Sequence, residues 1–573
     1  MSSPAVVRQR IHPAYAAGLL VLLAIGLWIR SPLLPWAAAS YRMTEAFSIE
    51  ETENVRISTG MLHEHTPNPH AFEYPSLFYY LSVLVEAPVK AAKGADWGAY
   101  LLAVRGLSLA FGLIAIVLGA ELARRLGGDA AGLLAGAILV TDRTMIELST
   151  IAKPNIAQLA FLLAGFLALL ALARAPRLRT ALIAAALFAL AAASKWLGAL
   201  GLVGLGVAPA LATAADPLAI RARGIPGIVS SLVWGLRARV SAVTLLTPLL
   251  VFAFVLLAAM PFALLSPKEF GYGLGQVFFA QGANRRALPP WVSIEYLYRS
   301  VGPFCFALVA GGLLWGFARL RHWDASARAN GEVLVLGWAV AYGLLVLFVF
   351  ARLPSYVDLW IPFLAVLAGL AWAGDAGWIR PRGVRFALAA LALVGGLWAN
   401  GTYASGRMAQ FKGDTRIAAA RWFSAHASTT DSLLVDLGVF VPDSLRSVRR
   451  NGWGTPPRLI YDETLTWGHD PVWPDDWYGG HRQMLFVNAR WAPPDSLLLA
   501  RPRFVATDAE WVANRQHPGR SIYGSTAYDA ALADASGRYV EVAHFTPHED
   551  GLLAGPEIRI FERRPAPAPE ASR

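Results

Sequence analysis

The run TEAFSIEETENVRISTGMLHEHTPNPHAFEYPSLFYY, residues 44–80, directly follows the first hydrophobic segment of the chain. It is polar and compatible with a helix, and it closes on an aromatic Glu-Tyr-Pro sequence before the chain becomes apolar again. Ionised side chains beside a bilayer are costly unless chemistry, a metal or a cationic ligand uses them. The run therefore indicates where a functional site lies. Its six acidic residues are Glu45, Glu50, Glu51, Glu53, Glu64 and Glu73.

The composition is that of a membrane protein. Hydrophobic residues make up 56% of the 573 residues and charged residues only 16%, whereas a soluble globular protein is about 25% charged. The formal net charge of +11 might suggest nucleic-acid binding, but the arginines cluster between hydrophobic segments, so we expect no nucleic-acid partner. Cys305 is the only cysteine, which excludes an intrachain disulfide framework.

The hydrophobic segments predict a polytopic α-helical membrane protein with about eleven transmembrane helices. A span needs roughly 20 mostly apolar residues to cross about 30 Å of hydrocarbon. The apolar stretch Leu77–Val89 is too short to span and predicts a helix at the membrane interface. The predicted spans are 14–29, 103–122, 129–141, 155–173, 180–194, 196–213, 241–264, 301–318, 333–351, 357–373 and 384–400.

Arginine is concentrated in every second loop between these segments. Such loops face the cytoplasm under the positive-inside rule. The pattern predicts a cytoplasmic N-terminus and, with an odd number of spans, a C-terminus on the outer face. The alternative is that WAAAS at 36–40 marks the end of a cleaved signal peptide. The loops carry Arg8 and Arg10, then Arg124 and Arg125, then Arg174, Arg177 and Arg179, then Arg221, Arg223, Arg237 and Arg239, then Arg319, Arg321 and Arg328, and finally Arg380, Arg382 and Arg385.

A second domain is expected after the last span. Short apolar runs (LLVDLGVFV, MLFVNA, RFVAT, YVEVAHF and EIRIF) alternate there with polar loops and with the helical stretch TRIAAARWFSAHA. This pattern predicts a small extracytoplasmic α/β domain. The expected organisation is a transmembrane domain at 1–401 with its acidic first outer loop at 32–100, an outer α/β domain at 402–564, and a Pro/Ala-rich disordered tail at 565–573.

Cations also lie on the predicted outer side. Lys195, in AAASKWLGAL between the fifth and sixth spans, is placed either to hold an anion or merely to reach the membrane edge. The loop at 266–300 carries Arg285 and Arg286 beside glycines and aromatics. Paired guanidinium groups suit a phosphate, and pairing with surface acids or lipid headgroups is the alternative. Tyr356, at the start of the tenth span, has the position of an aromatic-belt residue.

Carboxylates and cations on one side of a membrane fit glycosyl transfer from a lipid phosphate. A carboxylate removes the proton from an acceptor hydroxyl and raises its nucleophilicity. The cations stabilise the phosphate that leaves as the glycosidic bond breaks. A groove among helices would accommodate the lipid tail. These residue types therefore predict an enzyme that acts on a lipid-linked sugar.

Four motifs give the chain a resemblance to a known family. They are Thr44-Glu45 after the first span, FEYPSL at 72–77, Arg105 in VRGLSLAFG, and Ser194-Lys195 after an alanine-rich span. In this order they resemble the GT-C membrane glycosyltransferases, in the branch of the dolichyl-phosphate-mannose protein mannosyltransferases and the lipid A aminoarabinose transferases. The resemblance covers roughly residues 10–400. It implies inverting transfer of a hexose or pentose from a polyprenyl-phosphate donor, on the outer leaflet, to a lipid, glycan or protein acceptor.

The resemblance also implies roles for individual residues. Relatives place an aspartate, the expected base, at the position of Thr44. Glu45 is therefore predicted to take the proton, with Glu73 as the second catalytic residue. Glu50 and Glu51, a turn or two further along a helix, are alternative bases. Tyr74 stands where some relatives have lysine, and the loop at 266–300 has no histidine to complete a metal site. We therefore expect no metal or other cofactor. The predicted substrate-binding residues are Lys195, Arg285, Arg286, Tyr74 and Tyr356.

Two other functions are left open by the sequence. A transporter would show inverted repeats and ionisable groups at the bilayer midplane, and neither is clear here. A non-catalytic sensor or scaffold is compatible with Thr44. The aromatic run TWGHDPVWPDDWYGGH at 466–481 is typical of a sugar-stacking surface but also of ordinary loop anchors. The arginine-rich, lysine-poor composition suits a bacterial plasma (inner) membrane, with membrane lipids around the spans and the second domain in the periplasm.

Overall fold

The computed structural model describes fifteen stretches of the chain, and they fall into two compact units. The first unit comprises Met1–Leu34, His65–Val85 and Ala103–Ala404, and the second comprises Pro35–Glu64, Glu86–Leu102 and Ser405–Arg573. The described residues are 12–38, 48–94, 96–213, 224–238, 242–284, 289–323, 326–349, 356–403, 414–428, 431, 433–435, 439, 503–508, 537–546 and 557–564.

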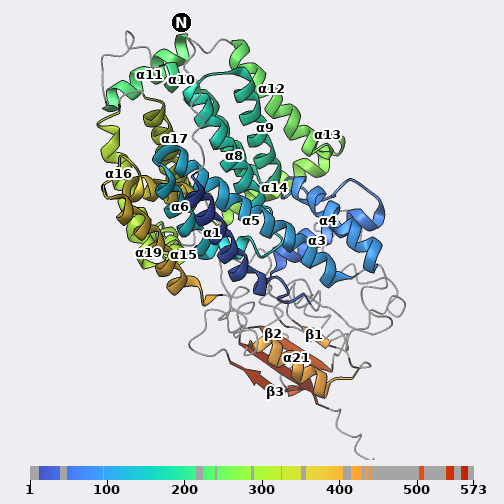
Figure 1. Cartoon of the computed structure of the whole chain (residues 1–573). Helices are drawn as coiled ribbons and strands as arrows, with labels where there is room; N and C mark the ends of the chain where they lie inside the picture. The colour runs from blue at the N-terminus through green and yellow to red at the C-terminus, as the bar shows by residue number, and fades with distance from the viewer. Residues whose placement is uncertain are drawn as a thin grey trace, which may run out of the picture. The chain divides into compact units, whose positions relative to one another are not determined.

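Most of the described chain is helical (Figure 1). A helix satisfies its backbone N–H and C=O groups within one segment, which is why apolar runs in lipid adopt it. The helices are α1 (Pro13–Arg30), η1 (Ser31–Leu33), α3 (Ile49–Glu64), α4 (Leu77–Lys93), α5 (Trp97–Gly127), α6 (Asp129–Thr141), α7 (Arg143–Leu148), α8 (Asn155–Arg174), α9 (Leu178–Ser194), η2 (Trp196–Gly201), α10 (Leu202–Thr213), α11 (Gly224–Ala238), α12 (Ala242–Ala259), α13 (Phe262–Leu265), α14 (Pro267–Asn284), α15 (Trp291–Val301), α16 (Pro303–Leu320), α17 (Ala327–Leu344), η3 (Leu345–Val349), α18 (Ile361–Ala368), η5 (Gly369–Ala373), α19 (Arg382–Asn400) and α21 (Thr415–His426).

The helices coincide with the predicted membrane segments. In the described part of the chain, six helices are long and apolar enough to cross a membrane, and five shorter apolar helices accompany them. This confirms the polytopic helical fold, while the number of crossings stays a prediction. The six are Pro13–Leu33, Trp97–Gly127, Asn155–Arg174, Pro303–Leu320, Arg328–Val349 and Arg382–Asn400, and the five are Asp129–Thr141, Leu178–Ser194, Trp196–Leu211, Leu246–Ala259 and Ile361–Ala373.

The core of the first unit forms around α8. This helix packs against α9, and α9 packs in turn against α12 (Figure 1). The aromatic ring of Phe166 in α8 meets Phe188 of α9, Trp338 of α17 and Phe363 of α18, at centroid distances of 6.0, 5.2 and 4.6 Å. Edge-to-face aromatic pairs of this kind stabilise packing beyond the area that they bury. The consecutive helices α8 and α9 are thus packed against α17 and α18, which lie far along the sequence.

Arginine-rich loops meet at one end of this unit. Arg174 Nη2, at the end of α8, donates to the carbonyl oxygen of Arg125 near the end of α5, at 2.9 Å. The N–H of Asp375, after η5, donates to the carbonyl oxygen of Gly127 at 3.0 Å. Three loops that the sequence assigns to the cytoplasmic side therefore share one end of the bundle. Which side of the membrane that end faces stays a prediction.

Buried polar contacts join the helix ends on the opposite side. Asp142 begins α7 and accepts hydrogen bonds from the backbone N–H of Met145 and from Ser300 Oγ, both at 2.7 Å. Asn400 Nδ2, at the end of α19, donates to the carbonyl oxygens of Thr141 at 2.9 Å and Ser300 at 2.8 Å. Buried polar groups are stabilising only when they are hydrogen bonded. These bonds therefore hold the ends of α6, α15 and α19 together.

In the second unit, α3 carries most of the acidic residues of the first loop. The helix begins with Glu50 and Glu51 in its first turn, where the helix dipole favours carboxylates. Glu50 is exposed and Glu51 is buried. Glu53 accepts a hydrogen bond from Arg56 Nε at 3.0 Å. The polar run is helical here, as the sequence indicates.

A carboxyl group is buried where α3 meets the C-terminal part of α4. Ser58 Oγ donates to Glu86 Oε1 at 2.7 Å, and Glu86 has no exposed surface. Burial raises the pKa of Glu86 to about 8, and the hydrogen bond from Ser58 opposes this shift. At neutral pH the side chain is therefore mostly protonated and uncharged.

Replacing Glu86 by glutamine is expected to flatten the pH dependence of stability. The pKa of about 8 in the folded protein lies above the ordinary value of 4.5, so the folded state binds the proton more tightly than the unfolded state. The stability that this group contributes is therefore complete below the ordinary pKa of 4.5 and is lost as the pH rises through the folded-state pKa of about 8. The loss is at most about 1.4 kcal/mol per pH unit. Thermal unfolding of the full chain in detergent from pH 5 to 8.5 measures the effect.

The matched control is Glu50→Gln, which removes an exposed carboxylate from the same unit. We expect Glu86→Gln to melt at a higher temperature than the wild type at alkaline pH and at a similar temperature at pH 5, whereas Glu50→Gln follows the wild type throughout. Parallel curves for all three proteins would show that Glu86 is not the titrating group.

The C-terminal part of the second unit contains a mixed sheet and α21. Among the described residues the strand order is β1-β2-β4-β3, with β1 parallel to β2 and the other pairs antiparallel. Phe423 of α21 packs on Phe504 of β2 and Ile560 of β4. An α/β region is thus present as predicted, and its boundaries stay a prediction. The segment MLFVNA, the run at 466–481 and the tail at 565–573 lie outside the described residues. The strands are β1 (Leu433–Val435), β2 (Phe504–Asp508), β3 (Tyr539–Phe545) and β4 (Ile558–Arg563).

Candidate functional site

Lys195 lies at the end of α9, away from the arginine-rich loops. The helix begins after Arg177 and ends at Ser194, and Lys195 is extended before η2 begins. Gly198 allows this tight connection, because a Cβ atom there would lie 2.3 Å from the carbonyl carbon of Ala191. A lysine at the end of an apolar helix keeps its charge without crossing the hydrocarbon. The lysine therefore lies at the end of the bundle opposite the arginine-rich loops.

Two aromatic rings and an amide surround the Lys195 amino group. Nζ donates to Asn155 Oδ1 at 3.1 Å. It also lies 5.6 Å from the ring centroid of Tyr74 and 5.6 Å from that of Tyr356, within the range of cation–π attraction. The structure therefore brings together three of the predicted site residues, which come from distant parts of the sequence.

A buried carboxylate stands behind the amide. Asp358 is 2% exposed, and its Oδ2 accepts a hydrogen bond from Asn155 Nδ2 at 2.8 Å. Its Oδ1 accepts the backbone N–H of Leu359 at 2.6 Å. Gln158 Nε2 donates to the carbonyl oxygen of Lys195 at 3.0 Å. Asn155 thus presents its oxygen to the ammonium group of Lys195 and its NH2 to the carboxylate of Asp358. These two bonds fix the position of Nζ, and the positive charge of Lys195 balances the buried carboxylate.

The chain between α3 and α4 is anchored to α14. Asn68 Nδ2 donates to Ser266 Oγ and to Glu269 Oε2, both at 3.3 Å, and His70 Nδ1 lies 3.2 Å from Glu269 Oε2. His65 and His70 have positive φ angles of 54° and 50°, an uncommon conformation for such residues. Asn68 supports the turn, because its Oδ1 accepts the N–H of His70 at 3.1 Å. This anchored segment leads directly to Glu73 and Tyr74.

Phe270 of α14 links this segment to the turn that carries Lys195. Its ring lies 5.9 Å from the rings of both Phe72 and Trp196, in edge-to-face geometry. Trp196 follows Lys195 in the sequence, and Phe72 lies two residues before Tyr74. The aromatic contacts therefore help to hold Tyr74 against the lysine.

Gly273→Ala is expected to displace this segment. A Cβ atom at Gly273 would lie 2.8 Å from the carbonyl carbon of Phe72, and such overpacking costs about 1–3 kcal/mol. Gly271→Ala is the control, since a Cβ there meets nothing within 4 Å and alanine stabilises a helix by about 1 kcal/mol relative to glycine. Thermal unfolding should show a lower melting temperature for Gly273→Ala only. Equal melting temperatures would contradict the close approach of the segment to α14.

The structure describes only some of the other predicted site residues. Glu73 is described and exposed. Arg105, from the third motif, is buried and donates through Nη1 to the carbonyl oxygen of Leu34 at 2.7 Å. Glu45, Arg285 and Arg286 lie outside the described residues.

Several residues of the site were not predicted from the sequence. Asp358 could have been found, because it is the only acidic residue in the predicted span 357–373. Asn155 and Gln158 carry no comparable signal. The contact between His70 and Glu269 joins residues far apart in the chain, and no local pattern indicates it. In the described part of the chain, no group of three or more His, Cys, Asp or Glu residues is arranged to hold a metal ion.

Comparison with known proteins agrees with the motifs. Residues 97–222 match the family model of the dolichyl-phosphate-mannose-protein mannosyltransferases. This stretch contains Arg105 and Ser194-Lys195, and the match confirms the resemblance that the motifs indicate. The chain is thus a multi-pass helical membrane protein similar to the GT-C glycosyltransferases. No curated protein sequence matches it.

The solved structures similar to the chain include those of two membrane proteins. One is ArnT from Cupriavidus metallidurans in the apo state, at 14% identity, covering 96% of this chain and 98% of that chain, with a TM-score of 0.49. The other is the archaeal oligosaccharyltransferase AglB from Archaeoglobus fulgidus, in complex with an inhibitory peptide and a dolichol-phosphate, at 12% identity. That comparison covers 93% of this chain and 73% of that chain, with a TM-score of 0.48.

Proposed function

We propose that the chain is an inverting membrane glycosyltransferase that uses a polyprenyl-phosphate-linked sugar. The observation that carries the proposal is the Lys195 amino group, held by Asn155 between the rings of Tyr74 and Tyr356. An ammonium group fixed in this way is a suitable partner for a phosphate, and aromatic rings beside it suit a sugar or a lipid. The family match over residues 97–222 supports the same class of donor.

The proposed reaction is a displacement at the anomeric carbon. The acceptor hydroxyl forms a new C–O bond as the bond between the anomeric carbon and the phosphate oxygen breaks. The electron pair leaves with the polyprenyl phosphate, whose charge is stabilised by Lys195, with Arg285 and Arg286. The hydroxyl proton passes to Glu45, and Glu73 orients the substrate. Attack from the side opposite the leaving phosphate inverts the configuration.

The proposed location is the outer leaflet of a bacterial inner membrane. α9 runs from an arginine-rich loop to Lys195, so a cytoplasmic arginine-rich end places the lysine on the outer side. The C-terminal domain is then periplasmic. The transferred sugar is a hexose or pentose, and the acceptor is a lipid, a glycan or a protein.

Binding and transfer assays on the purified full chain in nanodiscs test the proposal. Undecaprenyl phosphate should bind measurably more tightly than undecaprenol, which lacks the phosphate. A panel of undecaprenyl-phosphate-linked hexoses and pentoses, incubated with membrane lipids and glycans as acceptors, should include one donor that releases undecaprenyl phosphate and transfers its sugar. Equal binding of the alcohol and the phosphate would exclude the phosphate site. Movement of intact donor across liposome membranes without cleavage would instead indicate a transporter.

A further inference from the structure

Helix α11 has an apolar face that points away from the core of the first unit. Ile225 is 54% exposed, Val229 54% and Val233 47%. These three residues follow one another at intervals of four, so they lie on one face of the helix. Gly227 and Ile228, on a different face, are buried, and Ile228 belongs to the core. The helix therefore packs on the bundle through one face and presents a second, aliphatic face outward.

α11 begins at the arginine-rich end of the bundle. The N–H of Gly224 donates to the carbonyl oxygen of Trp323 at 3.3 Å, in the loop between α16 and α17. The start of α17 packs in turn on the ends of α5 and α8, since a Cβ atom at Gly331 would lie 2.5 Å from Leu126 Cδ2 and 2.9 Å from Leu170 Cδ2. Figure 1 shows α11 beside α10 at this end. The outward face thus lies where the bundle is expected to meet a membrane surface.

The length of α11 argues against a membrane crossing. Its 15 residues rise roughly 22 Å at 1.5 Å per residue, which is less than the about 30 Å of hydrocarbon. An aliphatic face left in water is unfavourable. A short helix with such a face lies instead in the plane of the membrane interface, with its apolar side chains at the boundary between headgroups and acyl chains.

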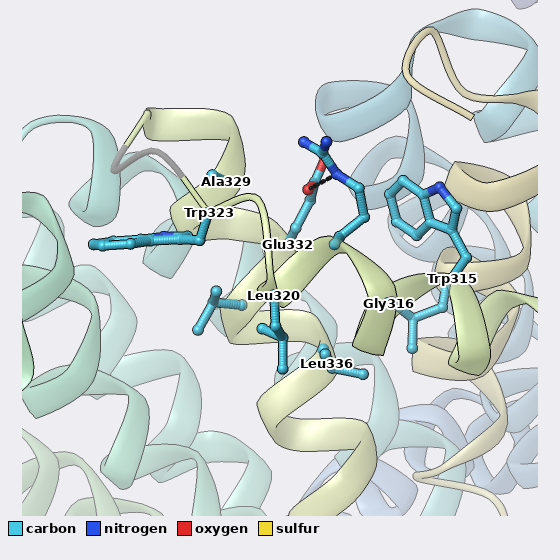
Figure 2. A pocket seen from close by; sticks show the side chains of 10 residues that line it. Trp315, Gly316, Leu320, Trp323, Ala329, Glu332 and Leu336 are labelled. Atoms are coloured by element: carbon cyan, nitrogen blue, oxygen red, sulfur yellow. Dashed lines mark hydrogen bonds and ion pairs between the residues drawn. The ribbon is translucent and has the colours of Figure 1, made fainter. Parts of the chain in front are cut away.

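The charge around α11 favours an anionic surface. From residue 217 to residue 268 the sequence contains five basic residues and no aspartate or glutamate. At the end of α16, Arg319 Nε donates to Glu332 Oε2 at 3.2 Å, so the positive charge of Arg319 is balanced (Figure 2). Arg321, in the loop that contacts the start of α11, is exposed. Positive charge therefore adjoins the aliphatic face.

We propose that α11 lies in the surface of the leaflet at the arginine-rich end and binds anionic phospholipids there. Ile225, Val229 and Val233 enter the acyl-chain boundary, and the basic residues around the helix attract the anionic headgroups. This surface is at the opposite end of the bundle from Lys195, and the proposal does not depend on the transferase activity.

Spin labels on the full chain in nanodiscs test this placement. Cys305 is the only cysteine and is buried, so a Cys305→Ser background accepts single labels at Val229→Cys and Val233→Cys. Collisions of the label with oxygen, which concentrates in hydrocarbon, and with a water-soluble nickel chelate measure its depth. In nanodiscs that contain phosphatidylglycerol, both labels should collide preferentially with oxygen and lie about 5–10 Å deep.

Two control positions calibrate the depth. Leu314→Cys, in the span α16 and 67% exposed in the wild type, should collide preferentially with oxygen. Arg321→Cys, in the loop beside α11, should collide preferentially with the nickel chelate. Labels at 229 and 233 that match Arg321→Cys would overturn the proposal in favour of a surface in water.

Two further outcomes would also contradict the proposal. Dipolar broadening between labels at position 229 or 233 of two copies would show that the face is a contact between chains. The labels should become shallower in nanodiscs of phosphatidylcholine alone, because the headgroups then carry no net charge. An unchanged depth there would contradict the preference for anionic phospholipids.

Discussion

Loss of the Lys195 amino group is expected to lower kcat/KM for sugar transfer by about 100-fold or more, because an ion aimed at developing charge is among the strongest catalytic contributions. The amino group is held 3.1 Å from Asn155 Oδ1, so it is positioned before substrate binds. The test variant is Lys195→Met, which keeps the apolar stem and removes the charge. Steady-state kinetics with an undecaprenyl-phosphate-linked donor measure the loss, and the affinity for undecaprenyl phosphate should fall with it.

A control is needed because Lys195 also balances Asp358. Removing the lysine alone leaves a buried carboxylate without its cation, and that is strongly destabilising. The double variant Lys195→Met with Asp358→Asn removes both charges, so it should recover the melting temperature of the wild type but not the activity. Lys153→Met, another lysine at the same end of the bundle, should remain active. A fully active double variant would show that the lysine has only a structural role.

The helices of this chain could be predicted from the sequence because few secondary structures other than the helix are stable across a bilayer. Each predicted span corresponds to a helix, and the alternation of arginine-rich loops matches the contact of Arg174 with Arg125 and of Asp375 with Gly127 at one end. In lipid, every membrane-crossing segment must form its backbone hydrogen bonds within the protein. The local composition is therefore sufficient to predict which segments are helical.

The site could be predicted only where a residue type is unusual for its position. Lys195 is such a residue, because a charged side chain directly after an apolar segment stands out in the sequence. Asn155 and Glu269 are ordinary residues in their own segments, and their partners Asp358 and His70 are distant in the sequence. Their roles arise from tertiary packing, which single-sequence patterns do not encode.

Glu45→Gln is expected to lower kcat by about 10²–10⁴-fold, the usual contribution of a general base. Threonine at position 44 has no useful basicity near neutral pH, so the adjacent carboxylate is the proposed proton acceptor, with Glu50 and Glu51 as the alternatives. Glutamine has nearly the same shape but accepts no proton, so the substitution separates proton transfer from binding. The affinity for undecaprenyl phosphate should therefore stay at the wild-type value, in contrast to Lys195→Met.

The pH profile gives an independent test of Glu45. If its carboxylate is the base, the wild-type rate falls on the acid side as the group becomes protonated, and this limb disappears from the residual rate of Glu45→Gln. Glu50 is exposed in the first turn of α3, and Glu50→Gln should keep both the rate and the acid limb. Full activity of Glu45→Gln, or an unchanged acid limb, would show that another group takes the proton. That result would not contradict the proposed role of Lys195 in stabilising the leaving phosphate. In the proposed reaction, phosphate stabilisation and proton removal act on opposite faces of the anomeric carbon.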